Sequence, residues 1–169
     1  HHGAEGLEVS SVVELRAGER LVRVETTVDN RRRDHRLRVH LPLPRPAATS
    51  RAECAFAVVE RGLEAEGGPT EVGLATFPSR RFVQAGGLTV VHEGLLEYEL
   101  VDVDGGAARA LAVTLLRCTG LLSAGPMATR PLPAGPMHVL EGPQLQGRLT
   151  LRWGWAVGDD VDPFALAED

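Results

Sequence analysis

Apolar and polar residues alternate along most of this chain, and that alternation limits its fold more than any other feature. Leu37, Val39 and Leu41 alternate with arginine and histidine, and the segment 149–155 alternates in the same way around two tryptophans. A two-residue period is typical of a β-strand with one face in a core and the other in solvent. No segment combines a helical apolar stripe with capping residues. The pattern therefore predicts many short strands and very little helix.

Eight or nine strands are expected, separated by turn residues. The expected strands are 7–13, 21–28, 36–41, 54–59, 88–91, 95–101, 110–118 and 149–155, although the period of 110–118 also allows a buried helix. The glycine pairs at 86–87 and 105–106 predict turns, and His92-Glu93-Gly94 is expected to join two strands as a hairpin. This spacing predicts an all-β fold, an antiparallel β-sandwich, as one domain over residues 1–169.

Proline and glycine mark where strands should stop. Pro42, Pro44 and Pro46 are expected to end the strand that begins at 36, because proline has no N–H to donate to a ladder. Residues 123–143 are rich in both and are expected to form a long loop, of the kind that often lies at an interface. The acidic residues after Gly158 are expected to be frayed.

Charge and composition exclude several classes of function. All 18 basic residues are arginine, so there is neither a Schiff-base lysine nor a phosphate-loop lysine. The net charge of −5 gives no field that favours nucleic acid. Arg31-Arg32-Arg33 is followed at once by Asp34, which favours a solvated hairpin turn over an anion contact. Neither a signal peptide nor an apolar run of membrane-spanning length is present, so a cytoplasmic protein without membrane contact is expected.

Metal and nucleophile patterns are weak in this sequence. Asp29, Asp34 and His35 lie close together but lack further ligands at typical spacing, so no metal site is expected. Cys54 and Cys118 lie in apolar runs and are expected to be free, buried thiols. A contact between either cysteine and a histidine is possible in space, but no spacing supports one.

A few side chains are candidates for contact with a sugar or another domain. Glu97 and Glu99 lie two apart and share one strand face, which favours a solvated face over a catalytic carboxylate pair. Trp153 and Trp155 are expected in the core or at a domain interface. The substrate-rim or domain-interface candidates are Arg80, Arg81, Tyr98 and Arg130, with ordinary surface arginines and a half-buried tyrosine as the simpler reading.

Several short motifs, taken in order, resemble one enzyme family. They are Asn30 with 34–39, then 78–82, 94–100, 113–117 and 129–131. In this order and spacing the chain resembles the C-terminal β-domain of glycoside hydrolase family 38, the class II α-mannosidases, over about 12–157. The resemblance implies a supersandwich-like domain without catalytic residues, taken from a larger enzyme whose N-terminal catalytic domain is absent here.

The resemblance also implies partners. The missing domain would hold an Asp nucleophile and a divalent metal, usually zinc, and would hydrolyse α-mannosides; this chain itself needs no cofactor. We expect the loop 123–143 to pack on that catalytic domain, with Arg130 pairing a carboxylate there or at the rim of the sugar site. The alternative is a stand-alone β-sandwich module that binds carbohydrate or protein.

Overall fold

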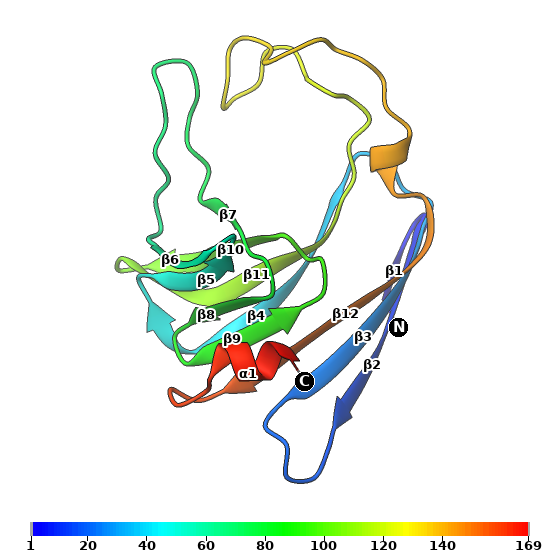
Figure 1. Cartoon of the computed structure of the whole chain (residues 1–169). Helices are drawn as coiled ribbons and strands as arrows, with labels where there is room; N and C mark the ends of the chain where they lie inside the picture. Colours follow the sequence, from blue (N-terminus) through cyan, green and yellow to red (C-terminus); the bar gives the residue numbers. More distant parts are fainter. Residues whose placement is uncertain (1, 169) are drawn as a thin grey trace.

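The computed structural model describes residues 2–168 and consists almost entirely of β-structure (Figure 1). Strands make up 54% of the residues and helices 5%. Every pairing between the described strands is antiparallel. The strands form two sheets that enclose a hydrophobic core. These observations confirm the expected all-β antiparallel sandwich.

The two sheets differ in size. The larger has eight strands, in the order β1 (His2–Ala4), β2 (Leu7–Leu15), β3 (Val22–Asn30), β12 (Gly147–Val157), β9 (Leu88–His92), β8 (Phe82–Ala85), β5 (Ser50–Cys54) and β6 (Ala57–Arg61). The smaller has four, in the order β4 (Arg36–Ala47), β11 (Ala107–Arg117), β10 (Glu97–Asp104) and β7 (Thr76–Pro78). The segment 54–59, expected as one strand, is divided: Cys54 ends β5, residues 57–59 begin β6, and the turn between them places Phe56 at a positive φ of 70°.

The main core lies between the sheets and follows the predicted alternation. Tyr98 and Leu111 from the small sheet meet Val83 and Val90 from the large one, and all four are fully buried. Burial of each such side chain stabilises the fold by about 1.5–3 kcal/mol. Trp153 and Trp155 pack half-buried against this cluster, which confirms the expected core position of the tryptophans.

Residues 159–168 are ordered, contrary to the expectation of a frayed end. Helix α1 (Pro163–Glu168) covers the outer face of the large sheet. Leu166 is buried there, and the Phe164 ring meets Phe82 edge-on at 5.0 Å between centroids. Two apolar anchors within six residues are too short a pattern to stand out in the sequence as a helical stripe.

The three prolines do not end their strand. β4 continues through Pro42 and Pro44 to Ala47, because it is the edge strand of the small sheet and bonds only to β11. Proline at an edge position costs no ladder bond on the side that faces solvent. The prolines thereby also blunt an exposed sheet edge.

Two expected hairpins are crossovers between the sheets. β9 belongs to the large sheet and β10 to the small one, so His92-Glu93-Gly94 carries the chain from one layer to the other. Residues 31–33 lie in the connection from β3 of the large sheet to β4 of the small one, which also crosses between the layers. Both segments are turn-rich, and turn residues alone do not say whether the next strand pairs with the last. The turns at 86–87 and 105–106 do close hairpins, as predicted.

Candidate functional site

Arg81, one of the four predicted site residues, is held within the domain. Its Nε and one terminal nitrogen donate to the two carboxylate oxygens of Glu53, both at 2.7 Å. Glu53 is buried, and the hydrogen bonds from Arg81 hold the pKa of its carboxyl below the usual value. The guanidinium also lies 5.8 Å from the ring centroid of Phe164. Arg81 therefore ties β5 to the start of β8 and to α1.

Tyr98 lies inside the sandwich rather than at its surface. Its side chain has no exposed area, and its hydroxyl lies 2.9 Å from Oγ of Ser50, in hydrogen-bond contact. The ring is tilted against that of Phe77 at 6.1 Å between centroids. A buried tyrosine normally finds a partner for its hydroxyl, so Tyr98 is fully accounted for by packing between the two sheets.

Arg80 and Arg130 keep their charged groups unpaired. Arg80 is exposed and, within residues 2–168, forms neither an ion pair nor a side-chain hydrogen bond. Arg130 is half-buried, and its Nε is shielded from solvent with no hydrogen-bond partner among the described residues. A shielded donor without a partner is unfavourable. The structure does not gather the four predicted residues into one site.

Two long loops rise together from one end of the sandwich, and we call them the tower. They are residues 62–75, between β6 and β7, and residues 118–146, between β11 and β12 (Figure 1). The backbone N–H of Val72 donates to the carbonyl of Thr129 at 2.8 Å, which joins the two loops. The expected long loop over 123–143 is confirmed as part of this projection.

Buried polar side chains hold the base of the tower. Asn30, at the end of β3, is fully buried. Its Nδ2 donates to the carbonyls of Gln144 and Leu145 at 3.0 and 2.9 Å, and its Oδ1 accepts from the N–H of Arg32 at 3.0 Å. One amide thus satisfies three backbone groups.

A second set of bonds closes the same base. The N–H of Asp34 donates to Oε1 of Gln144 at 2.9 Å, and Nε2 of Gln144 donates to Oδ1 of Asp34 at 2.7 Å. That oxygen also accepts from the N–H of Gly120 at 2.8 Å. A Cβ on Gly120 would lie 2.6 Å from Nε2 of Gln144. We call Asn30, Asp34, Gly120 and Gln144 the base clamp; it fixes both ends of the longer tower loop.

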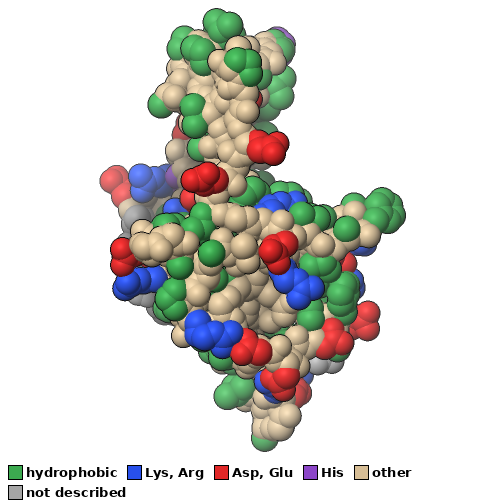
Figure 2. Space-filling view, turned by 90° about the vertical axis from the view of Figure 1, so that its left-hand side faces the viewer, with side chains coloured by type: hydrophobic (Ala, Val, Ile, Leu, Met, Phe, Trp, Pro, Cys, Tyr) green, Lys and Arg blue, Asp and Glu red, His purple; other side chains and the backbone are tan. Residues whose placement is uncertain are grey.

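The free part of the tower is apolar. Figure 2 shows hydrophobic side chains gathered over its tip. The exposed large apolar residues on the two loops are Val72, Leu74, Leu121, Leu122, Met127, Leu132, Met137, Val139 and, at the base, Leu145. Isolated surface leucines are ordinary, but a contiguous apolar group on a projection marks an interaction surface. The tower is therefore the best candidate interaction site of this chain.

Glu97 and Glu99 share one face of the small sheet, as predicted, and arginines neutralise both. Burial raises the pKa of Glu97, but hydrogen bonds from Thr114 and Arg117 outweigh it, and the pKa lies below its usual value. Arg36 and Arg38 complete the network at 2.8 Å from Glu97 and 2.6 Å from Glu99. The carboxylates have the role of a structural ion-pair network.

A cysteine and a histidine do meet, which the spacing in the sequence could not indicate. Sγ of Cys118 lies 4.0 Å from Nε2 of His35. Cys118 is buried, and burial raises the pKa of its thiol, so it stays protonated at neutral pH and is not an activated nucleophile. Cys54 is only half-buried, and both thiols are free. Among the side chains that the structure describes, residues 5–168, no group of three or more His, Cys, Asp or Glu is placed to hold a metal ion.

Comparison with solved structures gives an informative similarity. No family model matches the sequence, and no curated protein matches it either. Among solved structures, an α-mannosidase from Enterococcus faecalis V583 matches with a TM-score of 0.73 and 27% sequence identity. The match covers 95% of this chain and 17% of that one, so the chain spans about a sixth of the length of the protein it resembles. The helices within the described residues are all too short to cross a membrane.

Proposed function

We propose that this chain is a non-catalytic β-sandwich domain of a longer α-mannosidase. The observation that carries the proposal is the match of nearly the whole chain to a small part of an α-mannosidase. The class II enzymes of glycoside hydrolase family 38 are the proposed family, on the motifs at 34–39, 78–82, 94–100, 113–117 and 129–131. Hydrolysis of α-mannosides belongs to the longer protein, in a separate catalytic domain.

The tower is the part of this domain proposed to contact the catalytic domain. Its base is held by the buried polar bonds of the base clamp, while its tip presents apolar side chains to solvent. A projection with a rigid base and an apolar tip loses little conformational entropy on docking. Burial of those side chains against a second domain would stabilise the contact by about 25 cal/mol for each Å² removed from water.

Arg130 is the proposed polar anchor of that contact. Arg130 is half-buried and forms no ion pair with the described residues, and a carboxylate supplied by the catalytic domain would pair with the terminal nitrogens of its guanidinium. The same domain is proposed to hold the divalent metal, usually zinc, and the nucleophilic aspartate that the resemblance implies. None of the residues described here is assigned to either.

The test compares the 169-residue chain with the longer polypeptide encoded by its gene. The proposal expects hydrolysis of an aryl α-mannoside by the longer polypeptide with zinc present, and none by the chain alone. A gene that encodes nothing beyond this domain would overturn the proposal. In that event the alternative, a stand-alone module that binds sugar or protein, would replace it.

A further inference from the structure

A small polar pocket lies at the end of the sandwich away from the tower's loops, around the tight turn between β8 and β9. It has a volume of about 250 Å³. Two backbone bonds close its frame: the N–H of Arg45 donates to the carbonyl of Gly86 at 3.0 Å, and the N–H of Gly158 donates to that of Gly87 at 2.9 Å. Chain segments from four strands or strand ends therefore meet at the pocket in fixed positions.

The floor of the pocket is bare backbone. Gly86 takes a φ of 54°, and a Cβ there would lie 2.1 Å from the carbonyl oxygen of Arg45. Only glycine fits this turn next to β4. With glycines at 86, 87 and 158, the space above them is left to the polar side chains of the walls.

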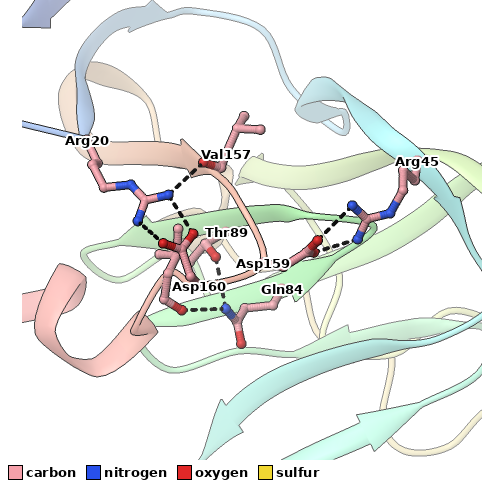
Figure 3. Close-up of polar contacts among 8 residues, drawn as sticks. Arg20, Arg45, Gln84, Thr89, Val157, Asp159 and Asp160 are labelled. Carbon is pink, nitrogen blue, oxygen red and sulfur yellow. Dashed lines mark hydrogen bonds and ion pairs between the residues drawn. The ribbon is translucent and has the colours of Figure 1, made fainter.

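An ion pair forms one wall. Arg45 donates from two nitrogens to the two carboxylate oxygens of Asp159, at 2.9 and 2.5 Å (Figure 3). The neighbouring Asp160 points the other way and receives the two donors of Arg20 at 2.9 and 2.8 Å. The two pairs hold the turn after β12 in place. Each oxygen of Asp159 uses one lone pair for Arg45 and keeps another for a ligand.

Unused polar groups form the other walls. Arg51 is exposed and has no ion pair or side-chain hydrogen bond to any residue from 2 to 168. Thr49, also exposed, offers a hydroxyl that both donates and accepts. The side-chain Nε2 of Gln84 donates to Oγ1 of Thr89 at 2.9 Å, and the side-chain Oε1 of Gln84 is left as an acceptor. Donors and acceptors thus both line a volume suited to one small ring.

This lining selects one class of ligand. It contains no aromatic ring and little apolar surface, so an apolar ligand would gain little from it. A simple anion would meet Arg51 but would also face the carboxylate of Asp159. A sugar ring suits both the Arg51 guanidinium and the Asp159 carboxylate, because its adjacent hydroxyls each donate one hydrogen bond and accept another. We propose that the pocket bounded by Arg45, Arg51, Gln84 and Asp159 binds a single hexopyranose ring through its vicinal hydroxyls.

The affinity should be low. Without a stacking platform, a single ring held by hydrogen bonds binds with a Kd of about 1–10 mM. Such a site would position a glycan as one of several contacts rather than capture a free sugar. The proposal does not depend on the proposed function, since it rests only on residues of this chain.

The pocket is tested by titrating the 169-residue chain with methyl α-mannoside to about 100 mM and following its amide chemical shifts. We expect saturable shifts at Gly86, Gly87 and Asp159. Arg51→Ala should weaken binding roughly tenfold through loss of a charged donor, and Thr49→Val should weaken it less. The control Arg109→Ala, which removes an exposed ion pair with Asp104 on the small sheet, should bind as the parent chain does.

Three results would overturn the proposal. In the first, neither the mannoside nor the matching galactoside causes a saturable shift. In the second, Arg51→Ala binds the mannoside with the affinity of the parent chain. In the third, the pocket responds to inorganic phosphate but to neither sugar. All three concern the isolated chain, so they leave the proposed role within a longer enzyme untouched. Conversely, absence of mannosidase activity in the longer protein would not affect the pocket.

Discussion

The two carboxylate oxygens of Glu53 each accept a hydrogen bond from Arg81 at 2.7 Å, so that a buried charge on β5 is matched by an arginine from a neighbouring loop. Arg80, the preceding residue, is exposed, and its side chain forms neither an ion pair nor a hydrogen bond with the described residues. Two adjacent arginines of one motif therefore have different roles: one stabilises the domain, and the other remains available at the surface.

Arg81→Ala should lower the melting temperature of the chain by several degrees, because it leaves the Glu53 carboxylate buried without its partner. Arg80→Ala is the matched control and should leave the melting temperature unchanged. The pKa of Glu53 is lowered in the folded state, so the stability from this pair is present above the unfolded pKa, near 4.5, and is lost as pH falls through the folded one. Equal melting of both variants at pH 7 would contradict the assigned role of Arg81.

Because the His92 imidazole is buried, the chain should also lose stability in mild acid. Nε2 of His92 lies 2.8 Å from Oγ of Ser79, its Nδ1 has no partner among the described residues, and burial lowers its pKa to about 4. Between pH 6.5 and 4 the unfolded chain takes up a proton that the folded chain does not. Folding should therefore weaken by about 3 kcal/mol over that range, with no penalty from this group above pH 6.5.

Urea unfolding at several pH values checks this effect. His92→Gln removes the titrating group and should flatten the pH dependence between 6.5 and 4. The loss due to carboxylates, at lower pH, should remain in that variant. A His92→Gln chain whose stability falls as steeply as that of the parent would show that the buried imidazole is not the cause.

The alternation in the sequence predicted the sandwich, but not which strands share a sheet. Leu37, Val39 and Leu41 follow the expected pattern, since side chains that face a core must be apolar at every second position. Whether a turn closes a hairpin or crosses between sheets depends on contacts with distant strands. His92-Glu93-Gly94 looks like a hairpin turn and carries the chain across the core instead.

The candidate site was less predictable than the fold. The loop at 123–143 could be recognised from its proline and glycine content, but its pairing with residues 62–75 rests on one backbone bond between distant segments. Tyr98 looked like a ligand contact because tyrosine suits that role, and only three-dimensional packing places it in the core. Asn30 and Asp34 stand in the first motif of the family resemblance, but no pattern in the sequence placed them against Gly120 and Gln144.

Asn30→Ala should destabilise the chain by about 2–3 kcal/mol, because two carbonyls and an N–H at the base of the tower lose their common partner. Asp104→Ala, which removes an exposed ion pair, is the control and should cost less than about 0.5 kcal/mol. Hydrogen exchange should also become faster across 118–146 in Asn30→Ala. Unchanged exchange in that loop would mean that the tower does not depend on its clamp.

Arg130→Ala separates the role of the tower in the isolated chain from its proposed role in a longer enzyme. In the isolated chain the substitution should leave the melting temperature nearly unchanged, because the Nε there has no partner to lose. In the longer enzyme it should weaken the contact between domains, where breaking one side of a buried charged pair costs about 3–5 kcal/mol. Wild-type kinetics and melting in both settings would mean that Arg130 is an ordinary surface residue.

Hydrolysis of an aryl α-mannoside decides whether this chain is a non-catalytic domain of a longer α-mannosidase. It is measured side by side, with zinc present, for the 169-residue chain and for the longer polypeptide from the same gene. We expect turnover by the longer polypeptide alone. Turnover by the purified chain that survives removal of contaminating enzyme, or a longer polypeptide that is inactive on every α-mannoside tried, would contradict it.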